Sequence, residues 1–354
     1  MWIKDLNQIL PKIQGKDEFV VIDKDDYIVI DYVFQGPFTF DSPEALECRG
    51  IKFNKDGSIL ARPFQKFFNH GERGHELDST RPHTVLEKLD GSMIHSAMLN
   101  DQIVLMTRKG ITDTAKQAWE AVTENHIRLF EDAAWNGVTP IFEYTSPNNR
   151  IVLPYSEPKL TLIGIRNTVT GEHCDPWSMI AWQAKYGVPL VDGFHTKDEM
   201  GDVYEFLAAV RDLEGKEGYV VRYHDGGMIK VKANDYVMKH RAKAMVGSHK
   251  QMLTVMREDA VDDVLPILSD EDRVIFEGFI DIVNHRLAQD AALVETLVLQ
   301  SKGKSRKEFA LEVVAKREPY LKTVLFQHWD GRPARELLLQ QKGLLEELLD
   351  SSRS

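Results

Sequence analysis

Lys88 and Asp90 form a pair of charged residues that could take part in catalysis. They stand two positions apart in TVLEKLDGSMIHSAML, a stretch that is otherwise apolar and typical of a β-strand. Side chains two apart in a strand share a face, so the two charges are predicted to stand side by side while Leu89 packs the other way. A solvated lysine, with a pKa of about 10.4, is charged at neutral pH and attacks an electrophile only when that pKa is lowered. Burial and neighbouring cations both have this effect, so further lysines are predicted close to Lys88.

A second group of charged residues occurs in KEGYVVRYHDGGMIKVKA, residues 216–233. Two strand-like runs flank an Asp-Gly-Gly sequence that is typical of a tight hairpin. With a two-residue turn, Lys230 and Lys232 fall opposite residues of odd number and Glu217 shares a face with both; a three-residue turn would break this register. The hairpin is therefore predicted to present one carboxylate and two ammonium groups. That set suits a nucleotide, because cations bind phosphates and a carboxylate binds a metal ion or a hydroxyl group.

Three more charged residues lie in or beside strand-like runs. Glu143 alternates with aromatic residues in TPIFEYTSPNNRIVLPY, and Arg49 precedes a glycine and a strand in ECRGIKF. Lys109 lies in MTRKG, which follows the strand after Lys88 and is predicted to bring its cations back near that lysine. Each also has a structural interpretation, as a partner of another charge or as a surface residue.

From residue 17 to about residue 235, the chain that carries these residues is predicted to consist mostly of strands, with a few helices. FVVIDKDDYIVIDYVF and RGIKFNKDGSILARPF each predict a hairpin, the second around Asp56-Gly57. VTPIFEY, RIVLPY and KLTLIGIRN predict further strands. Helices are predicted over residues 113–136, which Gly137 could end, and around 176–186 and 198–213.

Beyond about residue 240 the pattern becomes helical. Apolar residues recur at helical spacing through a long segment: Ile275, Phe276, Phe279, Ile280, Val283 and Leu287. ARELLLQQKGLLEELL closes the chain in the same way. We therefore predict an α+β domain of antiparallel sheets with helices over residues 1–243, and an all-helical C-terminal domain over residues 244–354.

Composition restricts the class of protein. The chain has 354 residues, of which 43% are hydrophobic and 28% charged, as in a globular protein with a sizeable core. A net charge of -11 argues against a general nucleic-acid coat protein and leaves room for a local basic groove. Only two cysteines occur, without a CxxC pair, so neither a disulfide framework nor a zinc site is indicated. With neither an apolar run of about 18 residues nor a signal-like start, we expect an intracellular protein without membrane contact.

Lys88-Leu89-Asp90-Gly91 matches the KxDG motif of the covalent nucleotidyltransferases, which include RNA ligases, DNA ligases and mRNA capping enzymes. IFEY, EGYVV and IKVK follow in the order of that superfamily. ECRGIKF, KFFNHGE and SPNNRIVLPY make the sequence most similar to the phage-type RNA ligase 1 family, over residues 30–240. The resemblance implies an ATP-grasp-like ligase domain, with two antiparallel sheets enclosing a nucleotide groove.

The resemblance also implies roles for particular residues. Lys88 would form a covalent lysyl-adenylate, and Asp90 would orient the loop around it. The other implied roles are ribose binding by Arg49 and Glu143, phosphate binding by Lys109, support of the metal ion or of the attacking lysine by Glu217, and α-phosphate binding by Lys230 and Lys232.

The activity implied by the resemblance is ATP-dependent RNA ligation in RNA repair. The enzyme would join 5′-phosphate and 3′-hydroxyl RNA ends through lysyl-AMP and RNA-adenylate intermediates, with Mg²⁺ or alternatively Mn²⁺. Such ends could belong to tRNA, and a separate kinase or phosphatase could supply them. We expect the enzyme to act as a monomer in the cytoplasm of a bacterial or virus-infected host cell. From its position after the ligase domain alone, we expect the helical domain to shape the choice of RNA. Two alternatives stay open. One is a DNA ligase or capping enzyme, whose hallmark is a β-barrel after the last motif, and the other is a catalytically silent RNA-binding module of the same fold.

Overall fold

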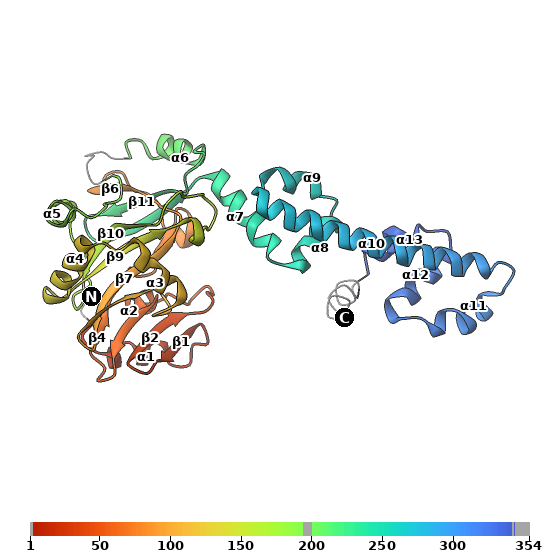
Figure 1. The fold of residues 1–354 in the computed structure, drawn as a ribbon, viewed down its shortest axis with the longest axis horizontal. Helices are drawn as coiled ribbons and strands as arrows, with labels where there is room; N and C mark the ends of the chain where they lie inside the picture. The colour runs from red at the N-terminus through yellow and green to blue at the C-terminus, as the bar shows by residue number, and fades with distance from the viewer. Residues whose placement is uncertain (1–2, 194–199, 342, 344–354) are drawn as a thin grey trace. The chain divides into compact units, whose positions relative to one another are not determined.

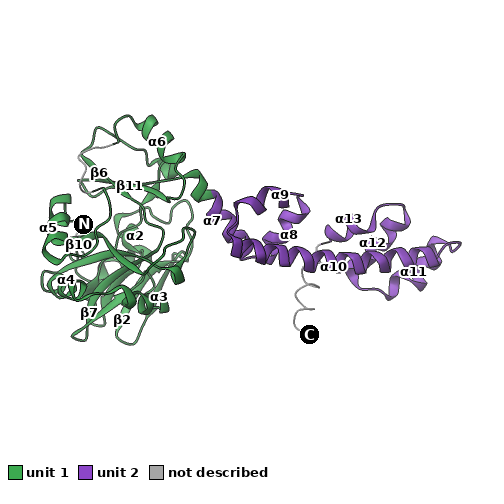
Figure 2. Cartoon of the chain, turned by 45° about the horizontal axis from the view of Figure 1, so that its top comes forward, with its two compact units in different colours: residues 1–237 green, residues 238–354 purple. Residues whose placement is uncertain are grey.

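The computed structural model describes residues 3–193, 200–341 and 343 (Figure 1). The chain divides into two compact units, residues 1–237 and 238–354 (Figure 2). The boundary expected near residue 243 falls inside α7 (Asn234–Val246), the helix in which the first unit ends and the second begins. Among the described residues, every helix is too short or too polar to cross a bilayer.

Three four-stranded sheets form the first unit. The first sheet is antiparallel and contains β1 (Phe19–Asp23), β2 (Tyr27–Tyr32), β3 (Ile51–Asn54) and β4 (Ile59–Ala61), in that order. The second, in the order β10-β9-β7-β8, is also antiparallel and contains β7 (Ser92–Leu99), β8 (Gln102–Met106), β9 (Val138–Thr145) and β10 (Lys159–Asn167). The third, in the order β5-β12-β11-β6, contains β5 (Phe68–Asn69), β6 (His83–Glu87), β11 (Gly218–Tyr223) and β12 (Met228–Lys232), with β5 parallel to β12.

The α+β class and both N-terminal hairpins are confirmed. The structure adds a further sheet to the two that were expected to enclose a groove, and one strand pair of the third sheet, β5 with β12, is parallel. Alternation explains how the third sheet packs. Val221 and Val231 face α6 (Val203–Arg211), while Val220 and Met228 face the second sheet and pack against Ile141. The second and third sheets therefore face each other across an interior that accepts both apolar and charged side chains.

Helices cover the outer faces of the sheets. In the first unit they are α1 (Leu10–Ile13), α2 (Pro43–Glu47), α3 (Asp113–Gln117), α4 (Glu124–Trp135), α5 (Pro176–Tyr186) and α6 (Val203–Arg211). Short 3-10 helices occupy Leu6–Gln8, Glu72–Gly74, Ala118–Ala121 and Pro147–Asn149. The helix at 176–186 was predicted with the correct bounds. The one predicted over 113–136 is three pieces, because Val122 is extended and Thr123 begins a new helix as its N-cap. Of the helix predicted over 198–213, residues 198–199 lie outside the described part.

The segment Arg150–Tyr155 was predicted as a strand, and that prediction was wrong. It forms an irregular loop whose amide groups do not join a ladder. The backbone N–H groups of Val152 and Leu153 instead donate to the Asp90 carboxylate at 2.7 and 2.6 Å. An apolar run of this length can pack in a loop when a buried side chain satisfies its backbone.

The second unit is helical. It contains α8 (His249–Arg257), α9 (Val261–Val264), α10 (Asp270–Gln300), α11 (Arg306–Glu312), α12 (Pro319–Trp329) and α13 (Ala334–Leu339), with 3-10 turns at Leu265–Ile267 and Val314–Lys316. The Ser269 side chain caps α10 by accepting from the Asp272 amide. Four of the predicted apolar positions are buried in its core, Phe276, Phe279, Val283 and Leu287, whereas Ile275 is exposed. Residues 344–349 of the predicted last helix lie outside the described residues.

Candidate active site

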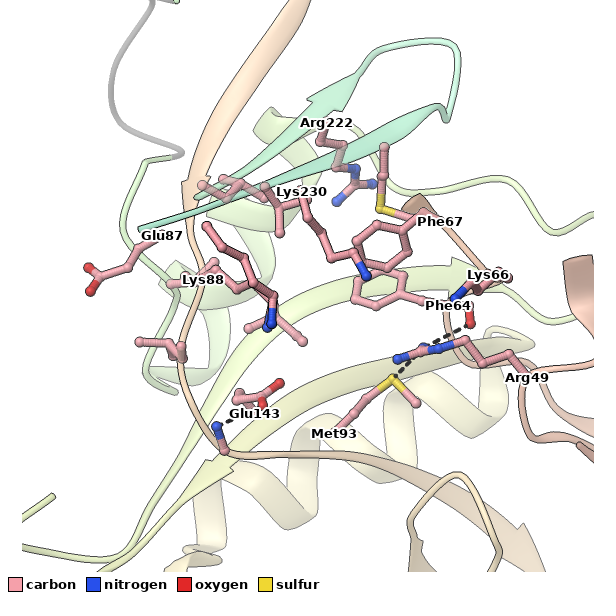
Figure 3. A pocket seen from close by; sticks show the side chains of 18 of the residues that line it. Arg49, Phe64, Lys66, Phe67, Glu87, Lys88, Met93, Glu143, Arg222 and Lys230 are labelled. Atoms are coloured by element: carbon pink, nitrogen blue, oxygen red, sulfur yellow. Dashed lines mark hydrogen bonds between the residues drawn. The ribbon is translucent and has the colours of Figure 1, made fainter. Parts of the chain in front are cut away.

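A cavity of about 290 Å³ lies between the second and third sheets (Figure 3). Residues predicted from the sequence contribute five of its charged side chains: Arg49, Lys88, Glu143, Lys230 and Lys232. Much of the rest of the lining is apolar or aromatic, including Leu86, Ile163, Val191, Val220 and Met228. An apolar slot with convergent cations can bury a flat ring system and bind the charged groups attached to it.

Lys88 lies where the chain leaves the third sheet and enters the second. Residues 88–91 join β6 to β7, so the expectation that Lys88 lies within a strand was wrong. The Lys88 amide still donates to Gly218 O at 2.9 Å, which fixes the segment beside β11. The Lys88 ammonium is 2.9 Å from Glu217 Oε2, and its side chain is only 22% exposed. The connection between two sheets thus holds this amine inside the cavity.

Glu217 joins the two lysines at the end of the hairpin. Its two carboxylate oxygens lie 2.9 Å from Lys88 and 2.9 Å from Lys232, and the residue is 3% exposed. The predicted register was wrong, since Lys230 pairs with Val220 and Lys232 with Gly218 around a three-residue turn. Glu217 still lies beside Lys232, as the predicted shared face required. It can do so because it precedes β11, where side chains no longer have to alternate between the two faces of the sheet.

Gly218 makes this change of direction feasible. Its φ of +135° lies in a region that favours glycine, and a Cβ there would stand 2.1 Å from Val231 O. The glycine of the EGYVV motif is therefore required by the backbone that turns Glu217 toward the lysines.

Asp90 does not line the cavity. It is 2% exposed, and besides the Val152 and Leu153 amides it accepts from the Tyr236 hydroxyl at 2.6 Å. Its own amide donates to the Tyr155 hydroxyl at 3.0 Å. The carboxylate thus ties the loop after β9 and the start of α7 to the segment that carries Lys88. Lys88 and Asp90 point to different surroundings, contrary to the shared face that the sequence predicted.

Glu143 lies on β9 below the same segment. Its Oε1 accepts from the Gly91 amide at 3.1 Å, and a Cβ on Gly91 would stand 2.3 Å from Tyr144 O, so only glycine permits this approach. Burial raises the pKa of Glu143 to about 7 against the opposing effect of Lys88, and Glu217 adds to the rise. Glu143 and Glu217 repel each other, and a cation close to both would relieve that repulsion.

Lys230 lies among cations rather than carboxylates. Burial lowers its pKa to about 7, and Lys66, Arg49, Lys88 and Lys232 lower it further. Its ammonium stands 5.1 Å from the Phe67 ring centroid. The convergence of lysines predicted from the chemistry of Lys88 is therefore present in the folded chain, and the cavity lacks enough negative charge to balance it.

Arg49 and Lys109 differ in their placement. Arg49 lines the cavity, where it donates to Phe64 O at 3.3 Å. Lys109 is exposed in a turn and is not among the described lining residues. Its neighbour Arg108 pairs with Asp31 at 2.9 Å and lies over the Tyr32 ring. Arg108 therefore holds the turn next to Tyr32, which lines the cavity. The turn was predicted to bring its cations back near Lys88, but neither Arg108 nor Lys109 is among the described lining residues.

Several lining residues were not predicted from the sequence, among them Lys66, Phe67 and Tyr32. Lys66 stands 5.4 Å from the ring centroid of Tyr32, which also lines the cavity, and Phe67 lies beneath both Arg49 and Lys230. The available signal was a lysine interleaved with aromatic residues in FQKFF, a pattern typical of nucleotide and nucleic-acid contacts.

Comparison with known proteins identifies the family. The model of a family described as RNA ligase, of the T4 RNA ligase 1 type, matches residues 47–245. The chain belongs to this RNA ligase family, and the membership predicted from the sequence is confirmed.

Relatives in the RNA ligase family include a putative RNA ligase of Thermovibrio ammonificans, 30% identical over 67% of this chain and 64% of its own. RNA ligase 1 of bacteriophage TS2126 is 29% identical over 68% of this chain and 63% of its own. The chain thus matches just under two thirds of the length of these relatives. Among solved structures, a putative ATP-dependent DNA ligase from Aquifex aeolicus is 14% identical, with a TM-score of 0.48 over 89% of each chain.

Proposed function

We propose that this chain is an ATP-dependent RNA ligase that joins 5′-phosphate and 3′-hydroxyl ends through a covalent adenylate on Lys88. The observation that carries the proposal is the bridge that Glu217 makes, 2.9 Å from each, between Lys88 and Lys232, two lysines that line the cavity of an RNA ligase family member. The deciding experiment is covalent labelling by α-labelled ATP and its loss in a Lys88 variant.

In the first step, the Lys88 amine gives its lone pair to the α-phosphorus of ATP. The bond between that phosphorus and the bridging oxygen breaks, the electron pair leaves with pyrophosphate, and the amine loses a proton. Glu217 accepts a hydrogen bond from the amine and is placed to take this proton. Lys230 and Lys232 stabilise the charge that develops on the phosphate oxygens.

In the second step, a 5′-phosphate oxygen of RNA attacks the same phosphorus. The phosphorus–nitrogen bond breaks, and Lys88 recovers its proton. In the third step, a 3′-hydroxyl attacks the activated 5′-phosphorus, loses its proton and displaces AMP. All three steps need cations around one phosphate, so we assign them to this cavity.

Magnesium or manganese enters the proposal as part of the nucleotide substrate. Among the described residues, no group of three His, Cys, Asp or Glu side chains forms a protein cage for a metal ion. Glu143 and Glu217 could hold a divalent cation together with phosphate oxygens, as Mg²⁺ prefers. When bound, the cation would neutralise phosphate charge. Arg49 and Glu143 remain our candidates for binding the ribose. Lys109 is exposed in a turn, so it would contact a phosphate only if the bound substrate reaches over that turn.

Nucleotide binding is expected to weaken as pH rises above about 7. The pKa of Lys230 is lowered to about 7 in the protein without nucleotide, so its side chain loses its charge as the pH rises above that value. Phosphates bind the charged form, so binding must take up a proton at higher pH, and affinity should fall by up to about tenfold per pH unit. Calorimetry with ATP and the non-nucleophilic Lys88→Arg variant would measure this decline.

The control adds Lys230→Arg to the same protein. A guanidinium stays charged throughout, so this variant should lose much less affinity over the same range. Parallel pH profiles for the two proteins would show that Lys230 is not the titrating group.

We also propose that the helical unit helps to select RNA ends. Its core is separate from the cores of the first unit, and α7 contributes Tyr236 to the Asp90 network. A chain ending after residue 247 should therefore keep Lys88 labelling at close to the full rate but change its preference among broken RNAs. Equal joining rates on a panel of RNA ends for both chains would argue against this role.

A further inference from the structure

Two phenylalanines are exposed in the loop that follows β2. Phe34 is 54% exposed and Phe38 is 78% exposed, and the neighbouring Val33 is 64% exposed. Three large apolar side chains are therefore exposed within six positions of one loop. Exposed apolar side chains that gather beside a functional site commonly mark a contact surface.

The loop is held in place by polar contacts at its inner side. Thr39 is fully buried, and its hydroxyl accepts from the Gly36 amide at 2.7 Å and donates to Glu18 at 3.2 Å. The Arg73 guanidinium donates to Pro37 O at 3.0 Å and to Gly36 O. The backbone is therefore fixed while Phe34 and Phe38 remain open to solvent.

The loop is continuous with the wall of the active-site cavity. Phe40, at its end, packs edge-on against Tyr32 at 5.1 Å and against Phe68 at 6.0 Å between ring centroids. Lys66 stands 5.4 Å from the Phe40 ring and 5.4 Å from the Tyr32 ring, and both Tyr32 and Lys66 line the cavity. An extended ligand that leaves the cavity past Tyr32 would thus meet the exposed rings next.

Cations accompany the rings along this path. Arg73 lies 5.7 Å from the Phe40 ring centroid, and Arg108 lies 4.7 Å from that of Tyr32. The whole chain carries a net charge of -11, so this local group of cations stands out against an acidic background. Aromatic faces that alternate with cations bind single-stranded nucleic acid, because bases stack on the rings and phosphates meet the charges.

We propose that Phe34 and Phe38 form a stacking platform for single-stranded RNA next to the end that is being joined. The inference rests on the proposed ligase function and adds the surface that holds the nucleotides outside the cavity. Neither ring lines the cavity, so the platform acts on RNA binding and not on the transfer of AMP to Lys88.

The test compares variants at both positions in binding to a short 5′-phosphorylated single-stranded RNA, measured by fluorescence anisotropy. The Phe34→Ala/Phe38→Ala protein should bind this RNA about tenfold more weakly or worse, with an unchanged salt dependence because no phosphate contact is removed. A Trp pair at the two positions should restore binding. A Leu pair, which keeps apolar area but offers no flat face, should not.

Trp135→Ala is the matched control, because Trp135 is 90% exposed on α4 and should leave RNA binding unchanged. Wild-type affinity in the alanine pair, or restored affinity in the leucine pair, would overturn the stacking platform. A changed oligomeric state with unchanged RNA affinity would instead assign the patch to a second copy of the chain. Lys88 labelling is followed in each protein, so that a failure of the platform is distinguished from a failure of the ligase function.

Discussion

Lys88→Ala is expected to abolish covalent labelling by α-labelled ATP, a loss of at least about a thousandfold in the rate of adenylate formation. The reason is that the proposed mechanism assigns the attack to the Lys88 amine and assigns Lys230 and Lys232 to phosphate. The protein is incubated with ATP and Mg²⁺, denatured, separated by electrophoresis and examined for retained label.

Two comparisons make this result interpretable. Lys88→Arg keeps a cation beside Glu217 but has no nucleophilic amine, so it should bind ATP and remain unlabelled. Lys116→Ala removes an exposed lysine of α3 and should label as the wild type does. Label retained by the Lys88 variants would place the nucleophile elsewhere. Labelling of the wild type by GTP alone would favour a capping enzyme, and no labelling at all would favour a silent RNA-binding module.

Glu47→Ala is expected to cost about 3–5 kcal/mol of the free energy of unfolding, because it leaves two buried guanidinium groups without the carboxylate that balances their charge. Glu47 accepts from Arg62 at 2.8 and 3.1 Å and from Arg166 at 2.7 and 2.9 Å. Arg62 is fully buried and Arg166 is 2% exposed. Urea denaturation followed by circular dichroism would measure the loss.

The control is Asp41→Ala, which breaks the exposed pair with Lys16 and should leave the urea midpoint nearly unchanged. Acid should reproduce the effect of Glu47→Ala. Burial opposes ionisation of Glu47, but Arg166 and Arg62 outweigh it and lower its pKa below the ordinary value of 4.5. The stabilisation is therefore present above about pH 4.5 and is lost as pH falls through the lowered pKa. Equal midpoints for the two variants would contradict this account.

The Glu47 cluster also affects the active site. Glu47 ends α2, and Arg49 enters the cavity two positions later. The two arginines that it binds follow β4 and lie on β10, so the cluster joins the first sheet to the second. A milder Glu47→Gln variant should therefore weaken ATP binding as well as folding.

Much of the fold and part of the site could be predicted because the signals are local. Turn residues between alternating runs indicated the hairpins, and the Lys-x-Asp-Gly motif indicated the candidate nucleophile. Strand and turn preferences depend on neighbouring residues, so a short segment carries them without knowledge of the rest of the chain.

The same local reasoning failed where one residue changed the geometry. A three-residue turn shifted the pairing of Lys230, and the loop at Val152 gave its amides to Asp90 instead of to a strand. Both outcomes depend on which structure satisfies the buried backbone groups, and that requires the partner segment.

The kinds of element, the helical character of the second unit and the charges available for phosphate chemistry could all be predicted from the amino-acid sequence. The folded chain was needed to show that Lys66 lines the cavity, that Lys109 does not, and that Glu217 bridges two lysines. These contacts join segments far apart in the chain. Their geometry is fixed by close packing between sheets, which no local pattern specifies.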